Sequence, residues 1–164
     1  MRGPLARLAL PLALVCGLAL LDQGVKFAME AALTERTPVP VLPPLYWYLT
    51  RNYGIAFSML DWMGEWGLVA VSTLVLGVVV ALWSRTPRAH RLAWFGFALV
   101  AGGAIGNLID RVMLGYVSDY VLLSAGGWSF AVFNLADAFI TLGAGAVLAD
   151  ELLGWGRRPV GDSS

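Results

Sequence analysis

The stretch from 92 to 109 reads LAWFGFALVAGGAIGNLI and contains no charged residue. A helix of this length is long enough to cross the ~30 Å hydrocarbon core of a bilayer. Its glycines permit close approach of neighbouring helices, as in the packing of membrane helices. The first charged residues after it are Asp110 and Arg111. The stretch therefore predicts a membrane-spanning helix that packs tightly against others.

Three further apolar runs extend this interpretation to the whole chain. We expect spans at about 8–28, 67–84, 92–110 and 131–153, within one domain that covers 1–164. The chain is 59% hydrophobic and 13% charged, with a mean hydropathy of +0.72, whereas a soluble domain is nearer half apolar and a quarter charged. The predicted fold class is an all-α membrane protein with four transmembrane helices. A net charge of zero gives no indication of nucleic-acid binding.

The first apolar run has an alternative interpretation as a cleaved signal peptide, because two arginines precede it. However, Val15 stands directly before Cys16, where a lipoprotein cleavage site requires a small residue. The run also continues as a plausible helix through Asp22 and Lys26. We therefore predict a retained membrane helix in which Cys16 is a small buried apolar residue.

Two segments between the spans are expected at the membrane surface. Four prolines between 38 and 44 exclude a helix there, and the aromatic run 45–50 is typical of a strand or an interfacial segment. The segment 111–130 is mixed in character, and we expect a short polar loop to carry Asp119. Indole rings commonly anchor at such interfaces, and four tryptophans fall near this one: Trp47, Trp62, Trp66 and Trp128.

The basic residues predict the orientation in the membrane. Seven arginines fall on one side of the four-span arrangement: Arg2, Arg7, Arg85, Arg88, Arg91, Arg157 and Arg158. The positive-inside rule then makes both termini cytoplasmic. His90 adds to the cytoplasmic basic loop, and the segments 34–66 and 111–130 face outward.

The chain has one cysteine and one histidine, far apart in sequence. Multi-cysteine and histidine-based metal sites and Ser-His or Cys-His nucleophilic centres are therefore disfavoured. Hydrolytic chemistry would have to use carboxylates, and Asp137 is the clearest candidate because it is predicted about two turns into the fourth span. Together with Asp119 it could share one proton, so that one carboxylate activates water and the other polarises a carbonyl group. The structural alternatives are that Asp137 is a helix-start residue or makes a buried polar contact, and that Asp119 caps a turn.

Other polar residues near the outer side have structural or orienting roles in this interpretation. Adjacent helical side chains point apart, so Asp110 and Arg111 should have different partners. Asn107 shares a face with Arg111 and is expected to orient the site or to bind a polar head group. Asp22 and Lys26 are four residues apart and form either a local ion pair or part of the same polar cluster.

Five sequence blocks, in order, resemble the motifs of the lipoprotein signal peptidase (signal peptidase II) family. They cover about 20 to 140, and no departure from the family pattern is visible. The blocks are Asp22-Gln23-x-x-Lys26, Arg51-Asn52-Tyr53-Gly54-Ile55-Ala56-Phe57-Ser58, Gly102-Gly103-Ala104-Ile105-Gly106-Asn107-Leu108-Ile109-Asp110-Arg111, Val117-Ser118-Asp119-Tyr120 and Phe133-Asn134-Leu135-Ala136-Asp137-Ala138.

The resemblance implies an aspartic endopeptidase of the bacterial inner membrane whose active site lies near the extracytoplasmic face. Asp119 and Asp137 match the catalytic pair, and a second set matches the supporting residues: Asp22, Lys26, Asn52, Gly54, Asn107, Arg111 and Asn134. The substrate would be a diacylglyceryl-modified prolipoprotein, cleaved just before its lipidated cysteine, with membrane lipids as surroundings. No metal or cofactor is implied, and we expect a monomer. The segment 36–60 would form a small β-cradle and interfacial segment, and the loop before Asp119 a mobile lid.

Three alternatives stay open at this point. Intramembrane aspartates also serve as proton relays in transporters, although no inverted repeat is evident. Clustered aspartates could hold Mg²⁺ in a lipid-processing enzyme. A non-enzymatic assembly factor is a third, but it leaves Asp137 without a role.

Overall fold

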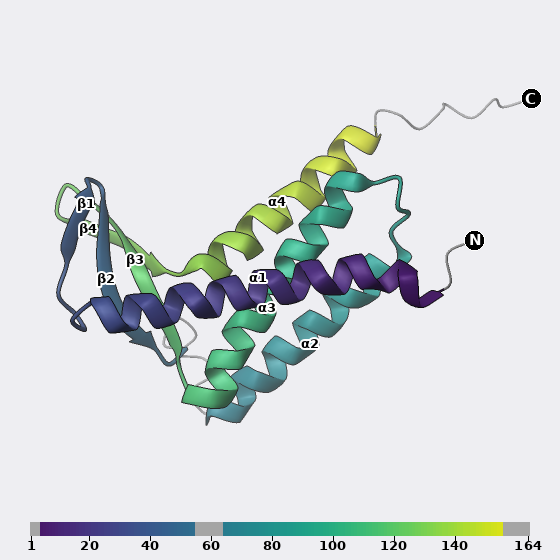
Figure 1. Cartoon of the computed structure of the whole chain (residues 1–164). Helices are drawn as coiled ribbons and strands as arrows, with labels where there is room; N and C mark the ends of the chain where they lie inside the picture. The colour runs from purple at the N-terminus through teal and green to yellow at the C-terminus, as the bar shows by residue number, and fades with distance from the viewer. Residues whose placement is uncertain (1–3, 55–63, 156–164) are drawn as a thin grey trace, which may run out of the picture.

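The computed structural model describes residues 4–54 and 64–155, and it consists of four long helices and one small sheet (Figure 1). The expectations for Trp62, for 55–58 of the second motif and for the terminal arginines at 2, 157 and 158 lie outside the described residues. In chain order the elements are α1 (Pro4–Ala32), β1 (Val39–Leu42), β2 (Leu45–Asn52), α2 (Gly64–Arg85), α3 (Arg91–Leu114), β3 (Val117–Ala125), β4 (Trp128–Phe133) and α4 (Leu135–Trp155).

Three of the helices are long and apolar enough to cross a membrane. These stretches are Ala9–Ala32, Trp66–Arg85 and Arg91–Leu114. The fourth helix, α4, has 21 residues and carries Asp137 in its first turn. The predicted start of this span at 131 is wrong, because 131–133 pair with β3 as part of strand β4. Helix α4 therefore begins only at Leu135, after the chain has left the sheet.

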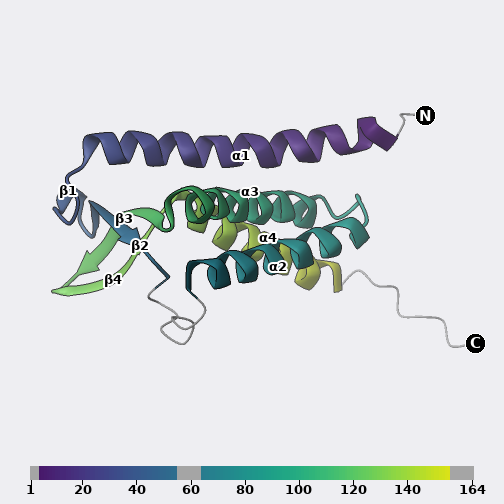
Figure 2. The same ribbon diagram turned by 90° about the horizontal axis from the view of Figure 1, so that it is seen from below.

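Helix α3 is the centre of the helical part, with α1 on one side of it and α2 and α4 on the other (Figure 2). Glycines make these approaches close. A Cβ atom at Gly102 would lie 2.6 Å from Leu18 of α1, and one at Gly96 would lie 2.6 Å from the carbonyl oxygen of Gly143 in α4. Packing at this distance leaves no room for a side chain, so the glycine-rich sequence of α3 specifies two helix contacts at once.

The strands form one antiparallel sheet in the order β1-β2-β3-β4. It lies at one end of the helices, whereas the first turn of α1, the last turn of α4 and the α2–α3 connection lie at the other (Figure 1). The β-structure expected within 36–60 is present as β1 and β2, whereas β3 and β4 are additions to the predicted fold class. The expectation of a loop around Asp119 is also wrong. Asp119 lies on β3 opposite Thr50 of β2, and only two residues separate α3 from β3, which leaves no room for a lid there.

Helix α1 contacts the other helices along a narrow stripe. The buried residues recur at spacings of four, three and four: Val15, Ala19, Asp22 and Lys26. This spacing keeps side chains on one face of a helix. Cys16 falls outside the stripe and is exposed, so its predicted burial is wrong.

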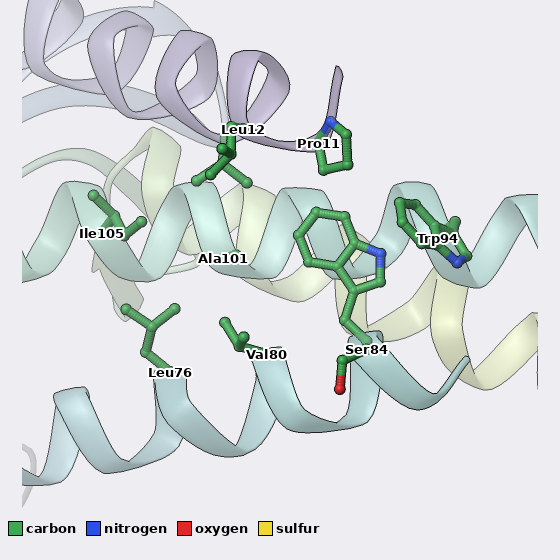
Figure 3. Close-up of a pocket in the computed structure, with 10 residues that line it drawn as sticks. Pro11, Leu12, Leu76, Val80, Ser84, Trp94, Ala101 and Ile105 are labelled. Carbon is green, nitrogen blue, oxygen red and sulfur yellow. The ribbon is translucent and has the colours of Figure 1, made fainter. Parts of the chain in front are cut away.

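An apolar cavity of about 280 Å³ lies between α1, α2 and α3. Leu12 of α1 lies across it from Leu76 and Val80 of α2 (Figure 3). Trp83 and Trp94 contact each other beside it with ring centroids 5.1 Å apart. The cavity is bordered by the apolar core of the helices, and it contains none of the aspartates of the motifs.

Candidate active site

The start of α4 places Asp137 by a reciprocal pair of hydrogen bonds. The backbone amide of Asp137 donates to Oδ1 of Asn134 (3.0 Å), and the amide of Asn134 donates to Oδ2 of Asp137 (3.2 Å). This is the geometry of a capping box, which satisfies two amides that a helix start leaves without partners. Asp137 is therefore in the first turn of α4, not two turns inside it as predicted. The other oxygen, Oδ1, accepts a bond from Nδ2 of Asn107 at 2.9 Å.

Asp119 is held on β3 by two side-chain amides. Nδ2 of Asn52 donates to Oδ2 at 3.0 Å, and Nδ2 of Asn134 donates to Oδ1 at 2.7 Å. The side chain is almost completely buried, with 2% of its surface exposed. Burial raises the pKa of Asp119 to about 6, against the opposing effect of the Asn52 hydrogen bond, and the nearby charge of Asp137 raises it further. A carboxyl group with such a pKa changes its protonation state close to neutral pH.

Two asparagines join the carboxylates into one network. Asn134 donates to Asp119 and also, at 3.2 Å, to Oδ1 of Asn107, which in turn donates to Asp137. The structure thus links the two aspartates through side-chain amides. They come from different elements, a strand and a helix. The negative charge of Asp137 disfavours ionisation of Asp119 in this arrangement.

A buried cation supports this network from α1. Nζ of Lys26 lies 2.8 Å from Oδ2 of Asp22, 2.8 Å from Oδ2 of Asp110 and 2.9 Å from Oδ1 of Asn107. The contacts with Asp22 and Asp110 are ion pairs, and the contact with Asn107 is a hydrogen bond donated by Lys26. Asp22 also accepts a bond from the amide of Ala136 at 2.9 Å. The two alternatives for Asp22 and Lys26 are therefore both true, because the ion pair is part of the cluster around the aspartates.

Asp110 and Arg111 have different partners, as predicted. Asp110 faces α1, where it accepts a bond of 2.7 Å from Gln23. Arg111 donates to the carbonyl oxygen of Asn107 at 3.3 Å, and its charge interacts with Asp137 and Asp119. The site is therefore acidic, with one arginine that stabilises negative charge at the pair.

Gly54 orients Asn52, so that the amide group of Asn52 faces Asp119. The backbone amide of Gly54 donates to Oδ1 of Asn52 at 2.9 Å, which directs the Nδ2 group of Asn52 toward the carboxylate. Gly54 has φ +84, a conformation that favours glycine. A Cβ atom at this position would also collide with the side chain of Leu68 in α2.

Sequence reasoning missed three contributors to the site. The hydroxyl of Tyr120 accepts a bond from the amide of Leu135 at 3.0 Å. Gln23 holds Asp110, and the amide of Ser118 donates to the other oxygen of Asp110 at 3.2 Å. All three stand inside the quoted motifs, but their positions in the sequence do not reveal which group each of them bonds.

His90 also has a defined position and an ion-pair partner. His90 lies at the α2–α3 connection as predicted, but its Nδ1 lies 2.6 Å from Oδ2 of Asp150, so it also links this connection to α4. Among 4–54 and 64–155, no group of three His, Cys, Asp or Glu side chains is arranged to hold a metal ion. The aspartates are instead held by amide groups and by Lys26.

A family model described as signal peptidase (SPase) II matches residues 14–153. The chain belongs to the signal peptidase II family. The family resemblance of the five motifs is thereby confirmed, and the protein is a membrane peptidase of this family. It is 52% identical over 141 residues to proteins named lipoprotein signal peptidase from Brucella ovis and from Brucella abortus strain S19, which covers 86% of this chain and 88% of each relative.

Two solved structures share the fold with this signal peptidase II family member. Both are described as bacterial membrane enzymes solved by the in meso method. The one at 2.3 Å resolution has a TM-score of 0.74 and 21% identity, with 94% of both chains covered. The one at 1.9 Å has a TM-score of 0.76 and 24% identity, with 87% of this chain and 92% of the other covered.

Proposed function

We propose that the protein is an aspartic endopeptidase that removes the signal peptide from diacylglyceryl-modified prolipoproteins, cleaving just before the lipidated cysteine. Asp119 and Asp137 form its catalytic pair. The observation that supports this most is the amide network that joins the buried carboxylate of Asp119 on β3 to the partly buried carboxylate of Asp137 on α4. Family membership and the relatives named lipoprotein signal peptidase support the class of substrate.

In the proposed reaction the pair shares one proton, with a water molecule between the two carboxyl groups. The ionised carboxylate takes a proton from this water, and the oxygen of the water attacks the carbonyl carbon of the scissile peptide. The protonated carboxyl group donates a hydrogen bond to the carbonyl oxygen, where negative charge develops. When the C–N bond breaks, a proton passes from the pair to the leaving nitrogen. The charge of Arg111 favours the anionic intermediate.

We place the protein in the bacterial inner membrane, with four spanning helices, both termini in the cytoplasm and the pair near the extracytoplasmic face. The α2–α3 connection, which carries basic residues, lies at the end opposite the sheet, which supports this orientation (Figure 1). Trp66 and Trp128 are 74% and 76% exposed, as suits interfacial anchors. The protein acts as a monomer. The acyl chains of the substrate enter sideways from the bilayer, where burial contributes about 0.8 kcal/mol per CH₂.

A gel-shift cleavage assay in detergent tests the catalytic pair. The substrate is a diacylglyceryl-modified prolipoprotein, and the wild type is compared with Asp119→Asn and Asp137→Asn in the presence of EDTA. These changes keep the size of each side chain but remove the titrating group, so we expect cleavage by the wild type alone. Cleavage by either variant, or a wild type that requires a metal ion, contradicts the proposal.

The same assay with an unlipidated precursor tests the role of the lipid. Because acyl burial supplies binding energy, the unlipidated form should be cut poorly. The Asn107→Asp variant serves as a control for the site, because it replaces an amide donor by a third carboxylate and should lose activity on both substrates. Equal cleavage of lipidated and unlipidated precursor by the wild type would refute the proposed role of lipid.

A further inference from the structure

The first turn of α4 is held by hydrogen bonds to other elements as well as by its own capping box. A helix start leaves its first amides without partners inside the helix. Here the amide of Ala136 donates to Asp22 of α1, and the amide of Leu135 donates to the hydroxyl of Tyr120 on β3. The position of Asp137 relative to the rest of the molecule therefore depends on side chains from two other elements.

Of these two side chains, Tyr120 has the closer relation to both aspartates. It is the chain neighbour of Asp119, and the amide that it binds lies two residues before Asp137. The hydroxyl thus joins the strand that carries one carboxylate to the helix turn that carries the other. Tyr120 is 2% exposed, and its ring lies 6.5 Å from the ring of Trp47. Because the buried ring of Tyr120 has few alternative positions, its hydroxyl is held in one place.

We propose that Tyr120 is a positioning residue, whose hydrogen bond to the Leu135 amide sets the separation of the Asp119 and Asp137 carboxyl groups. The inference rests on the proposed catalytic pair. The separation matters because two carboxylates share a proton more strongly when they are closer. Repulsion between the two carboxylates separates the two limbs of the pH–activity profile of such a pair. A longer or variable separation weakens this repulsion and misplaces the attacking water.

The hydroxyl itself does not titrate in the range of the test. Burial raises the pKa of Tyr120 to about 12. Any shift in the pH profile near neutrality therefore reports on the aspartates and not on the tyrosine.

Two substitutions each remove the hydrogen bond between the Leu135 amide and the Tyr120 hydroxyl, one at the acceptor and one at the donor. Tyr120→Phe removes the acceptor and keeps the ring, and Leu135→Pro removes the donor and keeps the hydroxyl. Leu135 is the first residue of α4, a position where proline is well tolerated because its φ suits a helix and no intrahelical bond is lost. The second variant therefore covers the case in which the first fails to fold.

The experiment measures kcat and KM for cleavage of the diacylglyceryl-modified substrate between about pH 4 and 9, at equal amounts of folded protein. For each variant we expect kcat to fall about tenfold or more with KM little changed, and the two limbs of the pH profile to move toward each other. The kcat of the double variant should be no lower than that of either single variant, because both substitutions remove the same hydrogen bond.

Tyr46→Phe, in the same sheet, is the matched control. Within the described residues its hydroxyl makes no hydrogen bond, and we expect a wild-type profile.

A pH profile with limbs at the wild-type positions in both variants would overturn the inference, even if kcat fell in both. The proposed function fails in a different way. In that case Asp119→Asn or Asp137→Asn cleaves in the same assay, and there is no catalytic pair to position.

Discussion

The two ends of the helical part are stabilised in different ways. At the sheet end, buried polar groups such as Lys26 and Asn134 each bond several specific partners. At the other end, Trp83, Phe97 and their neighbours pack through apolar contacts around a cavity of about 280 Å³. A buried polar group that loses its partner is costly, whereas an apolar core tolerates substitutions that keep its volume. The sheet end should therefore be sensitive to the loss of a single hydrogen-bonding or charged group, and the other end mainly to changes of side-chain volume.

The largest effect is expected from Lys26→Met. It leaves the carboxylates of Asp22 and Asp110 buried without their cation, and breaking a buried ion pair in this way costs about 3–5 kcal/mol. Thermal unfolding in detergent should show a strongly lowered Tm, together with loss of cleavage. Arg85→Met at the opposite end is the control, because Arg85 is exposed and should change stability by less than about 0.5 kcal/mol. Similar losses of stability in the two variants would contradict the proposed difference between the two ends.

The next effect is a pH dependence of stability that arises from Asp119. Its pKa is raised in the folded state to about 6 from 3.8, so the folded protein binds this proton more tightly than the unfolded chain. This group therefore stabilises the fold fully below about pH 4, and that contribution is lost as pH rises toward 6, by about 3 kcal/mol. Denaturant unfolding across this range should show the loss in the wild type. An equal loss of stability over this pH range in Asp119→Asn would show that another group causes it.

A smaller effect is expected from adding one methyl group at a glycine. A Cβ atom at Gly106 would meet the carboxylate of Asp22, so Gly106→Ala must displace a charged group and should cost about 1–3 kcal/mol. Gly77 of α2 has open space around it, and Gly77→Ala should stabilise the helix by about 0.5–1 kcal/mol. Unfolding free energies of the pair give the comparison directly. A tolerated alanine at Gly106 would show that the polar cluster is less rigid than its contacts indicate.

The smallest effect is expected inside the apolar cavity. Val80→Ile adds one methylene group to its wall and should change stability by no more than about 1 kcal/mol, with cleavage unaffected. Val78→Ile, on the same helix but not lining the cavity, is the matched control. Impaired cleavage in Val80→Ile alone would mean that the two ends are coupled.

Much of the helical arrangement could be predicted from the sequence. Long uncharged runs identify α1, α2 and α3, and the scarcity of histidine and cysteine directs attention to Asp119 and Asp137. These features are local or compositional. They can therefore be read without knowing which segments meet.

The strands β3 and β4 and the start of α4 could not be predicted in this way. Asp119 is on a strand because β3 pairs with β2, more than sixty residues earlier in the chain, and such pairing has no local signal. The predicted depth of Asp137 is wrong because contacts with Asp22 of α1 and Tyr120 of β3 hold the first turn of α4 in place. The exposure of Cys16 likewise depends on which face of α1 meets α3.

The pairing of β2 with β3 has a consequence for biosynthesis. Asn52 leaves the ribosome well before Asp119, and translation proceeds at about 5–20 residues per second. During those seconds β2 has β1 beside it but lacks its partner on the other edge. Asp137 and its helix follow later still. The newly made chain therefore has no assembled pair of carboxylates until its last helix is in place, and a truncated product would be inert in the membrane.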